Sequence, residues 1–452
     1  MLRNVVRLIL LVSLAAFSLP AVAASAAAPA PTARSGHLLI EGGVFKVPGG
    51  SRPLTFRSWC QPTVFSPDGS MLASGTWLRS GCRASTIVIR RAHGPTTELP
   101  HLSGGVATSI SWSPDQTRLA VYLANNTGDE IWIANVDGSG ATKVYDGDDG
   151  AIRLESDTVS WSPDGSRLAV SGTDKVHLAD LTRSGRSFIA QLYTIPAVGG
   201  TPQPYNTPDV DPSCAASREC HSVRYGAPLW SPEGAALLAD ATDVTWRAAG
   251  GISVSTAAAT VAETATAPDR LRTLRQVSYP ATARPNIGTP SFAHWWSADG
   301  RTVISATAPP AGVPDLPGLE PYAYIDVATK HAKRVGPPRS VVYDWQPCPT
   351  GTCVVWPTSR IPKVAITAVH PAAGEHQPLR VVSAVSPRQP SDQARMWLDV
   401  RRGGEWRPFT YTLARQSSRG RLLAYFYDRP KSGPCRVVAT FLLQSDVRRV
   451  RC

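Results

Sequence analysis

The sequence predicts an all-β protein, and three observations support this fold class. It contains 36 glycines and 40 prolines among 452 residues, which provides for many turns. Only 18% of the residues are charged, which is low for a protein built from long exposed helices. One short pattern, an aromatic residue followed by Ser-Pro-Asp-Gly and an apolar run, recurs along the chain. Short strands joined by frequent turns explain all three observations.

The N-terminal segment has the features of an export signal. Arg3 and Arg7 precede an apolar run, Leu8–Leu19, which is too short to span a bilayer comfortably. Two Ala-x-Ala cleavage candidates follow this run. We therefore predict a signal peptide over residues 1–26, a flexible lead-in over residues 27–36, and a secreted protein. No cysteine follows the apolar run where a lipid anchor would attach.

The recurring pattern is predicted to be a β-hairpin. In the copy VSWSPDGSRLAV, which begins at Val159, apolar and polar residues alternate up to Trp161, as expected for a strand. Pro163 fits the second position of a turn, and Gly165 supplies the left-handed conformation that reverses the chain. The apolar run that begins at Leu168 is then the return strand.

The copies recur at a spacing that predicts a β-propeller. Successive aromatic residues are separated by 47, 49, 69, 66 and 49 residues and stand at Phe65, Trp112, Trp161, Trp230, Trp296 and Trp345. A repeat of about 40–50 residues made of short strands is typical of a propeller, in which each repeat is one four-stranded blade. The two long gaps contain residues 202–224 and 247–292. We expect these segments to be loop insertions with at most one added hairpin.

The start of the chain and the last copy are predicted to share one blade. The residues after His37 have the pattern of the outer half of a blade but follow no hairpin. The copy around Trp345 has a hairpin but no outer half. We therefore expect the N-terminal strands to complete the last blade, which closes a ring of six blades within residues 37–360 and removes exposed sheet edges.

Residues 361–452 are predicted to form a separate domain. Six segments with alternating polarity follow one another at short spacing, and the last begins at Cys435. This spacing is typical of a small β-sandwich of the immunoglobulin type. The stretch YFYDRPKSGPCRVVATFLL, which begins at Tyr425, resembles the late strands of Ig-like modules in exported bacterial proteins.

The repeat also resembles a known family. Copies of Trp-Ser-Pro-Asp-Gly with an apolar return strand, followed by an aromatic strand and a Gly-rich turn, are similar to the TolB-type propeller repeat, also called PD40. The resemblance covers residues 36–358 and implies a six-bladed β-propeller, followed here by the small Ig-like β-sandwich. It implies little about function, because the family hosts many roles.

The cysteines of an exported chain are expected to form disulfides. Zinc is the alternative, but no C-x-x-C motif is present and the cysteine couples are far apart in sequence. For the last couple we expect a hairpin that turns near residues 444–446. The predicted couples, with spacings of 22, 6, 5 and 17 residues, are Cys60–Cys82, Cys214–Cys220, Cys348–Cys353 and Cys435–Cys452.

The carboxylates of the repeated turn are predicted to be structural. An Asp at one fixed turn position caps its own backbone, whereas a catalytic pair needs two different environments. The residues concerned are Asp68, Asp115, Asp164, Glu233 and Asp299. A separate acidic loop is a calcium candidate, but it lacks the EF-hand pattern, and we favour a solvated loop. Its acidic residues are Asp146, Asp148, Asp149, Glu155 and Asp157, of which the first three are the calcium candidates.

No catalytic motif stands out in the sequence. It contains no G-x-S-x-G, H-E-x-x-H, P-loop or G-x-G-x-x-G pattern. We therefore expect a secreted, non-catalytic binding or scaffold protein, without a cofactor, whose propeller face engages a protein or cell-envelope component. The net charge is +12, but the charged residues form no block of like sign in the sequence. We therefore expect neither a nucleic acid partner nor a membrane span.

The alternative is a secreted propeller enzyme that acts on glycans or lactones in the central funnel. Three or more charged groups that converge there would favour the enzyme, and an apolar or water-filled channel would favour the binding protein. Under either hypothesis the polar groups would come from loops between blades. The candidates are Arg79, Arg83, Asp129, Asp174, His221 and His294.

Overall fold

The structure is a computed structural model that describes the chain in segments between residues 37 and 452. The predicted signal peptide and lead-in lie outside the described residues. In the described part every regular element is a strand, and no helix there could cross a membrane. The described residues are 37–40, 44–47, 50–53, 60–75, 86–100, 102, 105–125, 128–155, 158–174, 190–205, 219–247, 252–263, 271–278, 294–297, 299–306, 322–335, 342–348, 352–357, 363–370, 377–386, 394–416, 421–430, 433–441 and 444–452.

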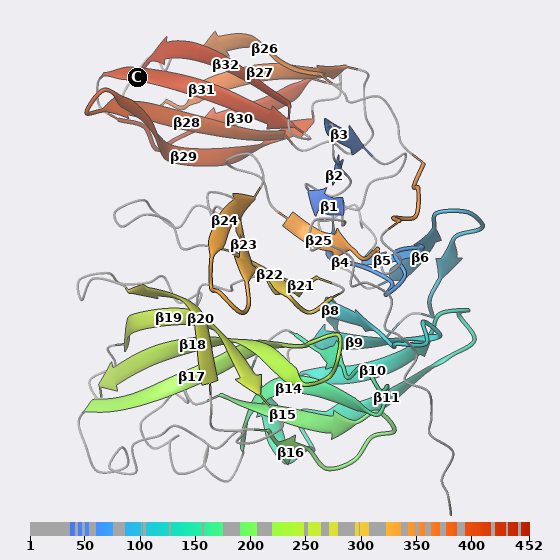
Figure 1. The fold of residues 1–452 in the computed structure, drawn as a ribbon. Helices are drawn as coiled ribbons and strands as arrows, with labels where there is room; N and C mark the ends of the chain where they lie inside the picture. Colours follow the sequence, from blue (N-terminus) through green and yellow to red (C-terminus); the bar gives the residue numbers. More distant parts are fainter. Residues whose placement is uncertain are drawn as a thin grey trace, which may run out of the picture. The chain divides into compact units, whose positions relative to one another are not determined.

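Six antiparallel sheets form the blades of a β-propeller (Figure 1). Blade 1 contains β4 (Cys60–Phe65), β5 (Met71–Gly75), β6 (Ile87–Arg91) and β7 (Thr97–Glu98). Blade 2 contains β8 (Val106–Trp112), β9 (Arg118–Ala124), β10 (Glu130–Asn135) and β11 (Ala141–Asp146). Blade 3 contains β12 (Ile152–Leu154) and β13 (Ser160–Trp161), which both pair with β14 (Arg167–Asp174), and then β15 (Gln191–Pro196) and β16 (Gln203–Pro204).

The remaining three blades complete the ring. Blade 4 contains β17 (Glu219–Trp230), β18 (Ala236–Arg247), β19 (Ile252–Glu263) and β20 (Leu271–Ser278). Blade 5 contains β21 (His294–Trp296), β22 (Thr302–Ala306), β23 (Tyr322–Asp326) and β24 (Ala332–Val335). Blade 6 contains β25 (Val342–Gln346), β1 (His37–Ile40), β2 (Val44–Val47) and β3 (Gly50–Pro53). First strands of successive blades contact one another from β25 through β4, β8, β13 and β17 to β21, which confirms the six-bladed propeller.

The two ends of the propeller segment meet in blade 6, but the number of strands that each end contributes differs from the prediction. The sequence predicted two N-terminal strands beside a complete hairpin, but three N-terminal strands join β25 alone. β1 pairs with β25, and Leu39 lies opposite Asp344. After β25, the described residues 352–357 form no strand, and Trp356 packs against Phe65 of blade 1, with ring centroids 5.8 Å apart.

The second predicted insertion contains the one hairpin that the prediction allowed, but this hairpin is the outer half of blade 4 and not an addition to it. Residues 247–292 were expected to be mainly loop, but they supply β19 and β20, the third and fourth strands of blade 4. β19 contains most of the Ala- and Thr-rich stretch, and it pairs along its length with β18. Small side chains gave this segment no hydrophobic alternation, although its backbone pairs on both sides. In the first insertion, residues 206–218 lie outside the described residues.

A buried serine organises the repeated turn. In the third copy the Ser162 hydroxyl donates to Asp164 Oδ1 at 2.5 Å and accepts the Arg167 N–H at 2.9 Å. Asp164 also accepts the Ser166 N–H at 3.0 Å. The Ser162 hydroxyl is the main cause that lowers the pKa of Asp164 to about 2, and the Ser166 bonds add to it. The aspartate is therefore a turn residue, as predicted, and the serine is the partner that the sequence argument missed.

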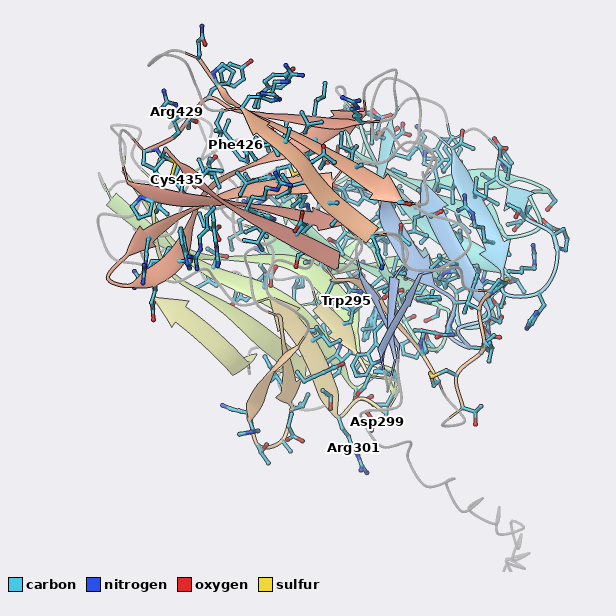
Figure 2. All side chains as sticks on the ribbon, turned by 90° about the horizontal axis from the view of Figure 1, so that it is seen from above. Trp295, Asp299, Arg301, Phe426, Arg429 and Cys435 are labelled. Atoms are coloured by element: carbon cyan, nitrogen blue, oxygen red, sulfur yellow. A yellow bond between two sulfur atoms is a disulfide. The ribbon has the colours of Figure 1, made fainter. Side chains whose placement is uncertain are left out.

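The same serine–aspartate bond recurs in other copies. It joins Ser66 to Asp68, Ser113 to Asp115, and Ser297 to Asp299. Figure 2 labels Asp299 and Arg301 in the fifth copy, where the Arg301 side chain points away from the ribbon. In the fourth copy Glu233 replaces the aspartate, and the Ser231 hydroxyl still accepts the Ala236 N–H at 3.0 Å.

Serine side chains also connect neighbouring blades. The first strand of each blade is an edge strand, and its outward N–H groups need acceptors. Ser111 on β8 accepts the Trp161 N–H of blade 3 at 3.0 Å. Ser160 on β13 accepts the Trp230 N–H of blade 4 at 3.1 Å. In blades 2 and 3, the serine before the aromatic residue therefore accepts a backbone N–H of the next blade.

A second kind of connection occurs where the residue before the aromatic one is apolar. Val64 and Leu229 have no side-chain acceptor, and their carbonyl groups serve instead. The indole Nε1 of Trp112 donates to the Val64 carbonyl at 3.1 Å. The indole Nε1 of Trp296 donates to the Leu229 carbonyl at 3.2 Å.

The C-terminal unit, residues 363–452, contains seven antiparallel strands. They are β26 (Lys363–His370), β27 (Leu379–Ser386), β28 (Ala394–Arg402), β29 (Glu405–Gln416), β30 (Leu422–Phe426), β31 (Pro434–Phe441) and β32 (Gln444–Arg451). Their order is β26-β27-β30-β29-β28-β31-β32. Immunoglobulin sandwiches arrange the first, second, fifth and fourth strands in one sheet and the third, sixth and seventh in the other. The Ig-like assignment stays a prediction, and this strand order supports it.

The core of the C-terminal unit lies between the two halves of its strand order. The Ile366 N–H on β26 donates to Asp446 Oδ2 on β32 at 2.6 Å, so the first and last strands approach each other. One apolar cluster collects the inward side chains of six strands: Val364, Ile366, Leu379, Val381, Met396, Leu398, Val400, Ala414, Leu422, Ala424, Phe426, Cys435, Val437 and Ala439.

Two of the four predicted disulfides are present, Cys348–Cys353 and Cys435–Cys452. The side chains of the other two couples lie outside the described residues. Cys452 is held further, because Arg429 Nη1 donates to its carbonyl oxygen at 3.1 Å. Figure 2 labels Arg429 and Cys435 in this unit. The predicted hairpin exists, but its turn was misplaced, since β31 ends at Phe441 and β32 already begins at Gln444.

Candidate functional site

Four charged side chains from three neighbouring blades converge on one region. Asp129 lies between β9 and β10 of blade 2, Arg153 is on β12 and Glu155 follows it in blade 3, and Arg224 is on β17 of blade 4. We call these four residues the charged cluster. It lies toward the end of the blades away from the repeated turns, because β9 and β14 both run from those turns toward it.

Glu155 is at the centre of the charged cluster. Its side chain is 15% exposed, and its Oε1 lies 3.8 Å from Arg153 Nε. The Thr173 hydroxyl donates to the same oxygen at 3.4 Å, and Arg224 Nη2 donates to the Glu155 carbonyl oxygen at 2.9 Å. Burial raises the pKa of Glu155, and the negative charge of Asp129 adds a smaller increase. The two arginines and the hydroxyl oppose this increase without cancelling it.

Asp129 has a different environment. The Tyr122 hydroxyl donates to its Oδ2 at 2.7 Å. The Asn125 N–H faces its Oδ1 at 3.4 Å, and its own carbonyl oxygen accepts the Gly147 N–H at 2.9 Å. Asp129 is therefore fixed by hydrogen bonds within blade 2, whereas Glu155 is enclosed mainly by arginines and buried surface.

Two buried tyrosines support the strands around the charged cluster. The Tyr145 hydroxyl on β11 accepts the Ile152 N–H at 2.9 Å and donates to the Ile152 carbonyl at 2.8 Å, which fixes blade 2 against blade 3. Burial raises the pKa of Tyr193 to about 12, and the charge of Asp174 contributes to the increase. Asp174 ends β14 and lies opposite Ile152.

The structure brings together only part of the predicted residue set. Asp129 belongs to the charged cluster, and Asp174 lies on the strand that carries Thr173. Arg79 and Arg83 lie outside the described residues. The remaining two candidates have described backbone but no described side chain: His221 on β17 and His294 on β21.

Sequence reasoning missed the roles of Arg153, Glu155 and Arg224. Glu155 stood in the acidic segment that was considered for calcium, and neither arginine was singled out. Arg153 and Glu155 could have been identified from the sequence, because these two charged residues flank Leu154 at the end of the short strand β12. Arg224 could not be found in this way, because only the blade 3–blade 4 contact brings it to Glu155.

The calcium candidates have structural contacts in the described part of the chain. Asp146 Oδ2 lies 2.6 Å from Lys143 Nζ, which also lies 3.0 Å from Glu130 Oε1. Asp146 Oδ1 accepts the Asp148 N–H at 3.0 Å. Within the described ranges, no group of three His, Cys, Asp or Glu side chains is arranged to hold a metal ion.

The charged cluster combines features that suit binding and proton transfer. Arg153 has 63% of its side chain exposed and can contact a ligand directly. A guanidinium group recognises carboxylates and phosphates through several donors at once. The raised pKa of Glu155 also keeps a fraction of its carboxyl group protonated at higher pH than an ordinary glutamate. Rigid strands hold both groups in place.

Comparisons with known proteins find similarity in structure only. No protein-family model matches the sequence, and no curated protein matches it. TolB from Acinetobacter baumannii is 13% identical, with a TM-score of 0.46 over 70% of this chain and 68% of that one. A chain of a nidogen–laminin complex is 12% identical, with a TM-score of 0.39 over 69% and 97%. A TolB described as putative, from Agrobacterium tumefaciens, is 16% identical, with a TM-score of 0.31 over 74% and 94%. The propeller assignment rests on the six sheets described above.

Proposed function

We propose that this chain is a secreted propeller scaffold that binds a protein or cell-envelope component through the charged cluster. The observation that carries the proposal is the convergence of Asp129, Arg153, Glu155 and Arg224 from three blades onto one region of a rigid ring. The two disulfides fit an oxidising compartment outside the cytoplasm. The solved structures that resemble the fold include proteins named TolB, which is compatible with a binding role but does not identify a partner.

A capture experiment with two matched variants tests the proposal. Wild-type protein, Arg153→Ala and Arg301→Ala are immobilised and exposed to an extract of cell envelopes, and the retained components are identified and titrated. Both arginines are exposed, but Arg301 follows a repeated turn in blade 5 and lies outside the charged cluster. We expect a saturable component that the wild type and Arg301→Ala retain and Arg153→Ala loses. Equal capture by all three proteins, or no saturable component, would contradict the proposal.

The charged cluster also keeps an enzyme as a second candidate. Asp129 and Glu155 are two carboxylates in different environments, which is what acid–base chemistry requires. The enzyme would act on glycans or lactones, with Glu155 as the proton donor. Hydrolysis of chromogenic glycosides and lactones by the wild type, lost in Glu155→Gln and reduced as the pH rises, would support it. Absence of turnover in the wild type would leave the binding role.

A further inference from the structure

Asp344 occupies the seam at which the first and last blades close the ring. It lies on β25, opposite Leu39 of β1, and is 4% exposed. Its Oδ2 accepts the Phe65 N–H of β4 at 2.5 Å, which joins blade 6 to blade 1. At this seam the first strands of the two blades, β25 and β4, come from opposite ends of the propeller segment.

The equivalent position carries serine in two other blades. Ser111 and Ser160 each stand before the aromatic residue and accept the N–H of the next aromatic residue, as Asp344 does for Phe65. A serine hydroxyl is neutral at every physiological pH, whereas a carboxyl group can ionise. The seam therefore has the same hydrogen bond as these junctions, but an acceptor that can gain a charge.

The strands of the seam and the first strand of the neighbouring blade 5 supply no arginine or lysine. β1, β4, β21 and β25 contain neither residue. Tyr324 of β23 packs against Trp345, with ring centroids 5.5 Å apart. Apart from Asp344, the titratable residues of these four strands are His37, Cys60, His294 and Tyr343, and β23 adds Tyr322, Tyr324 and Asp326. Only two N–H donors, those of Phe65 and Trp345, are available to the carboxyl group in the described structure. Among the described side chains, an ionised Asp344 would thus have no opposite charge beside it.

We propose that Asp344 makes closure of the propeller ring depend on pH: the neutral carboxyl group keeps the first and last blades together, and its ionisation loosens the seam. The closed seam protects the group from water, while an opened seam lets water solvate the carboxylate. Ionisation therefore favours the open form. A loosened seam would separate β25 from β4 first, since the Asp344–Phe65 hydrogen bond joins these two strands.

The direction of the pKa shift agrees with this device. Burial raises the pKa of Asp344 to about 7, against the opposing bonds from the Phe65 and Trp345 N–H groups. A group whose pKa is higher in the closed form stabilises that form at low pH, and the stabilisation is lost as pH rises through the closed-form value. The seam should thus be tight near pH 5 and weakest above pH 7.

Hydrogen exchange of the full chain tests the proposal. Protection factors of amides in β1, β4 and β25 are measured from pH 5 to pH 8 after correction for intrinsic exchange. With a closed-form pKa of about 7 and an open-form value of about 3.9, protection should fall on the order of 100-fold over this range. Amides of β9 and β10 in blade 2 serve as the internal reference and should keep their protection.

Three variants decide between the carboxyl group and other causes. Asp344→Asn and Asp344→Ser remove the charge, and Asp344→Ser also reproduces the acceptor of the other junctions. Both should abolish the fall in protection. Ser160→Asp should create a similar fall at the junction of blades 3 and 4. The proposal is wrong if the wild type shows no pH dependence at the seam, or if a folded Asp344 variant retains it.

Discussion

Equivalent tryptophans of the repeat should respond differently to the same substitution. Trp112 and Trp161 are 5% and 4% exposed, and both lie between blades. Trp112 Nε1 donates to the Val64 carbonyl at 3.1 Å. Trp161 Nε1 is buried and has no hydrogen-bond partner among the described residues. Phenylalanine removes a similar part of each ring, so the packing losses are similar. The Arg118 guanidinium lies 5.0 Å from the Trp161 ring centroid, a contact that a phenyl ring keeps in part, so the indole hydrogen bond makes the main difference.

The size of the difference follows from the value of a buried hydrogen bond. Trp112→Phe removes the donor and leaves the Val64 carbonyl without this partner, which costs about 1–3 kcal/mol beyond the packing loss. Trp161→Phe removes an N–H whose burial already costs about 1–3 kcal/mol. The free energy of unfolding should therefore be lower for Trp112→Phe than for Trp161→Phe by about 2 kcal/mol or more.

Urea denaturation followed by far-ultraviolet circular dichroism measures this difference, provided that the m values agree. A second pair provides the control: Trp296 donates to the Leu229 carbonyl, and Trp230 Nε1 is buried without a partner in the described structure. Trp296→Phe should resemble Trp112→Phe, and Trp230→Phe should resemble Trp161→Phe. Equal losses in the free energy of unfolding within both pairs, or the reverse order, would refute the role given to the indole hydrogen bonds between blades.

Two further substitutions test the turns and the disulfide. Cys452→Ser breaks the bond to Cys435 and should lower the stability of the C-terminal unit by about 3 kcal/mol. Thermal unfolding measures this loss, and the C-terminal unit of the reduced wild type should show the same loss. Gly69→Ala should destabilise the protein more than Gly165→Ala. Both glycines have φ of +72°, but only at Gly69 would the added Cβ meet a backbone atom, the Pro347 oxygen, at 2.6 Å. The conformational cost alone is about 1–2 kcal/mol at each site, and equal midpoints in urea would argue against the close contact at the seam.

Local chemistry made much of the fold predictable. Pro, Asp and Gly at fixed positions specify the turn between the first two strands of a blade, so the blades could be counted from the sequence, although the sixth predicted hairpin does not form. The strand pattern failed in blade 4, because β19 is rich in small residues and shows no alternation, although backbone pairing on both sides makes it a strand. The closing blade was divided wrongly for a related reason: whether residues after β25 return as a strand depends on where Trp356 packs.

The candidate site was less predictable than the fold. Asp129 could be named as a polar residue in a loop, but its partners in the charged cluster come from two other blades. The rest of blade 3 lies between Glu155 and Arg224 in the sequence, so no local pattern connects these two residues. The same applies to Asp344 and Phe65, whose hydrogen bond joins positions 279 residues apart.

The sequence by itself thus determined the repeat, the turns, the number of blades and two disulfide pairings, because each depends on residues that are close along the chain. Only the tertiary structure decided which side chains meet between blades. Those contacts depend on how six sheets close into one ring, where burial and distance set whether a serine, a carbonyl or a carboxyl group accepts the N–H of the next blade. Asp344 illustrates the distinction: its place in the repeat is visible in the sequence, but its burial against Phe65 of the first blade exists only in the closed ring.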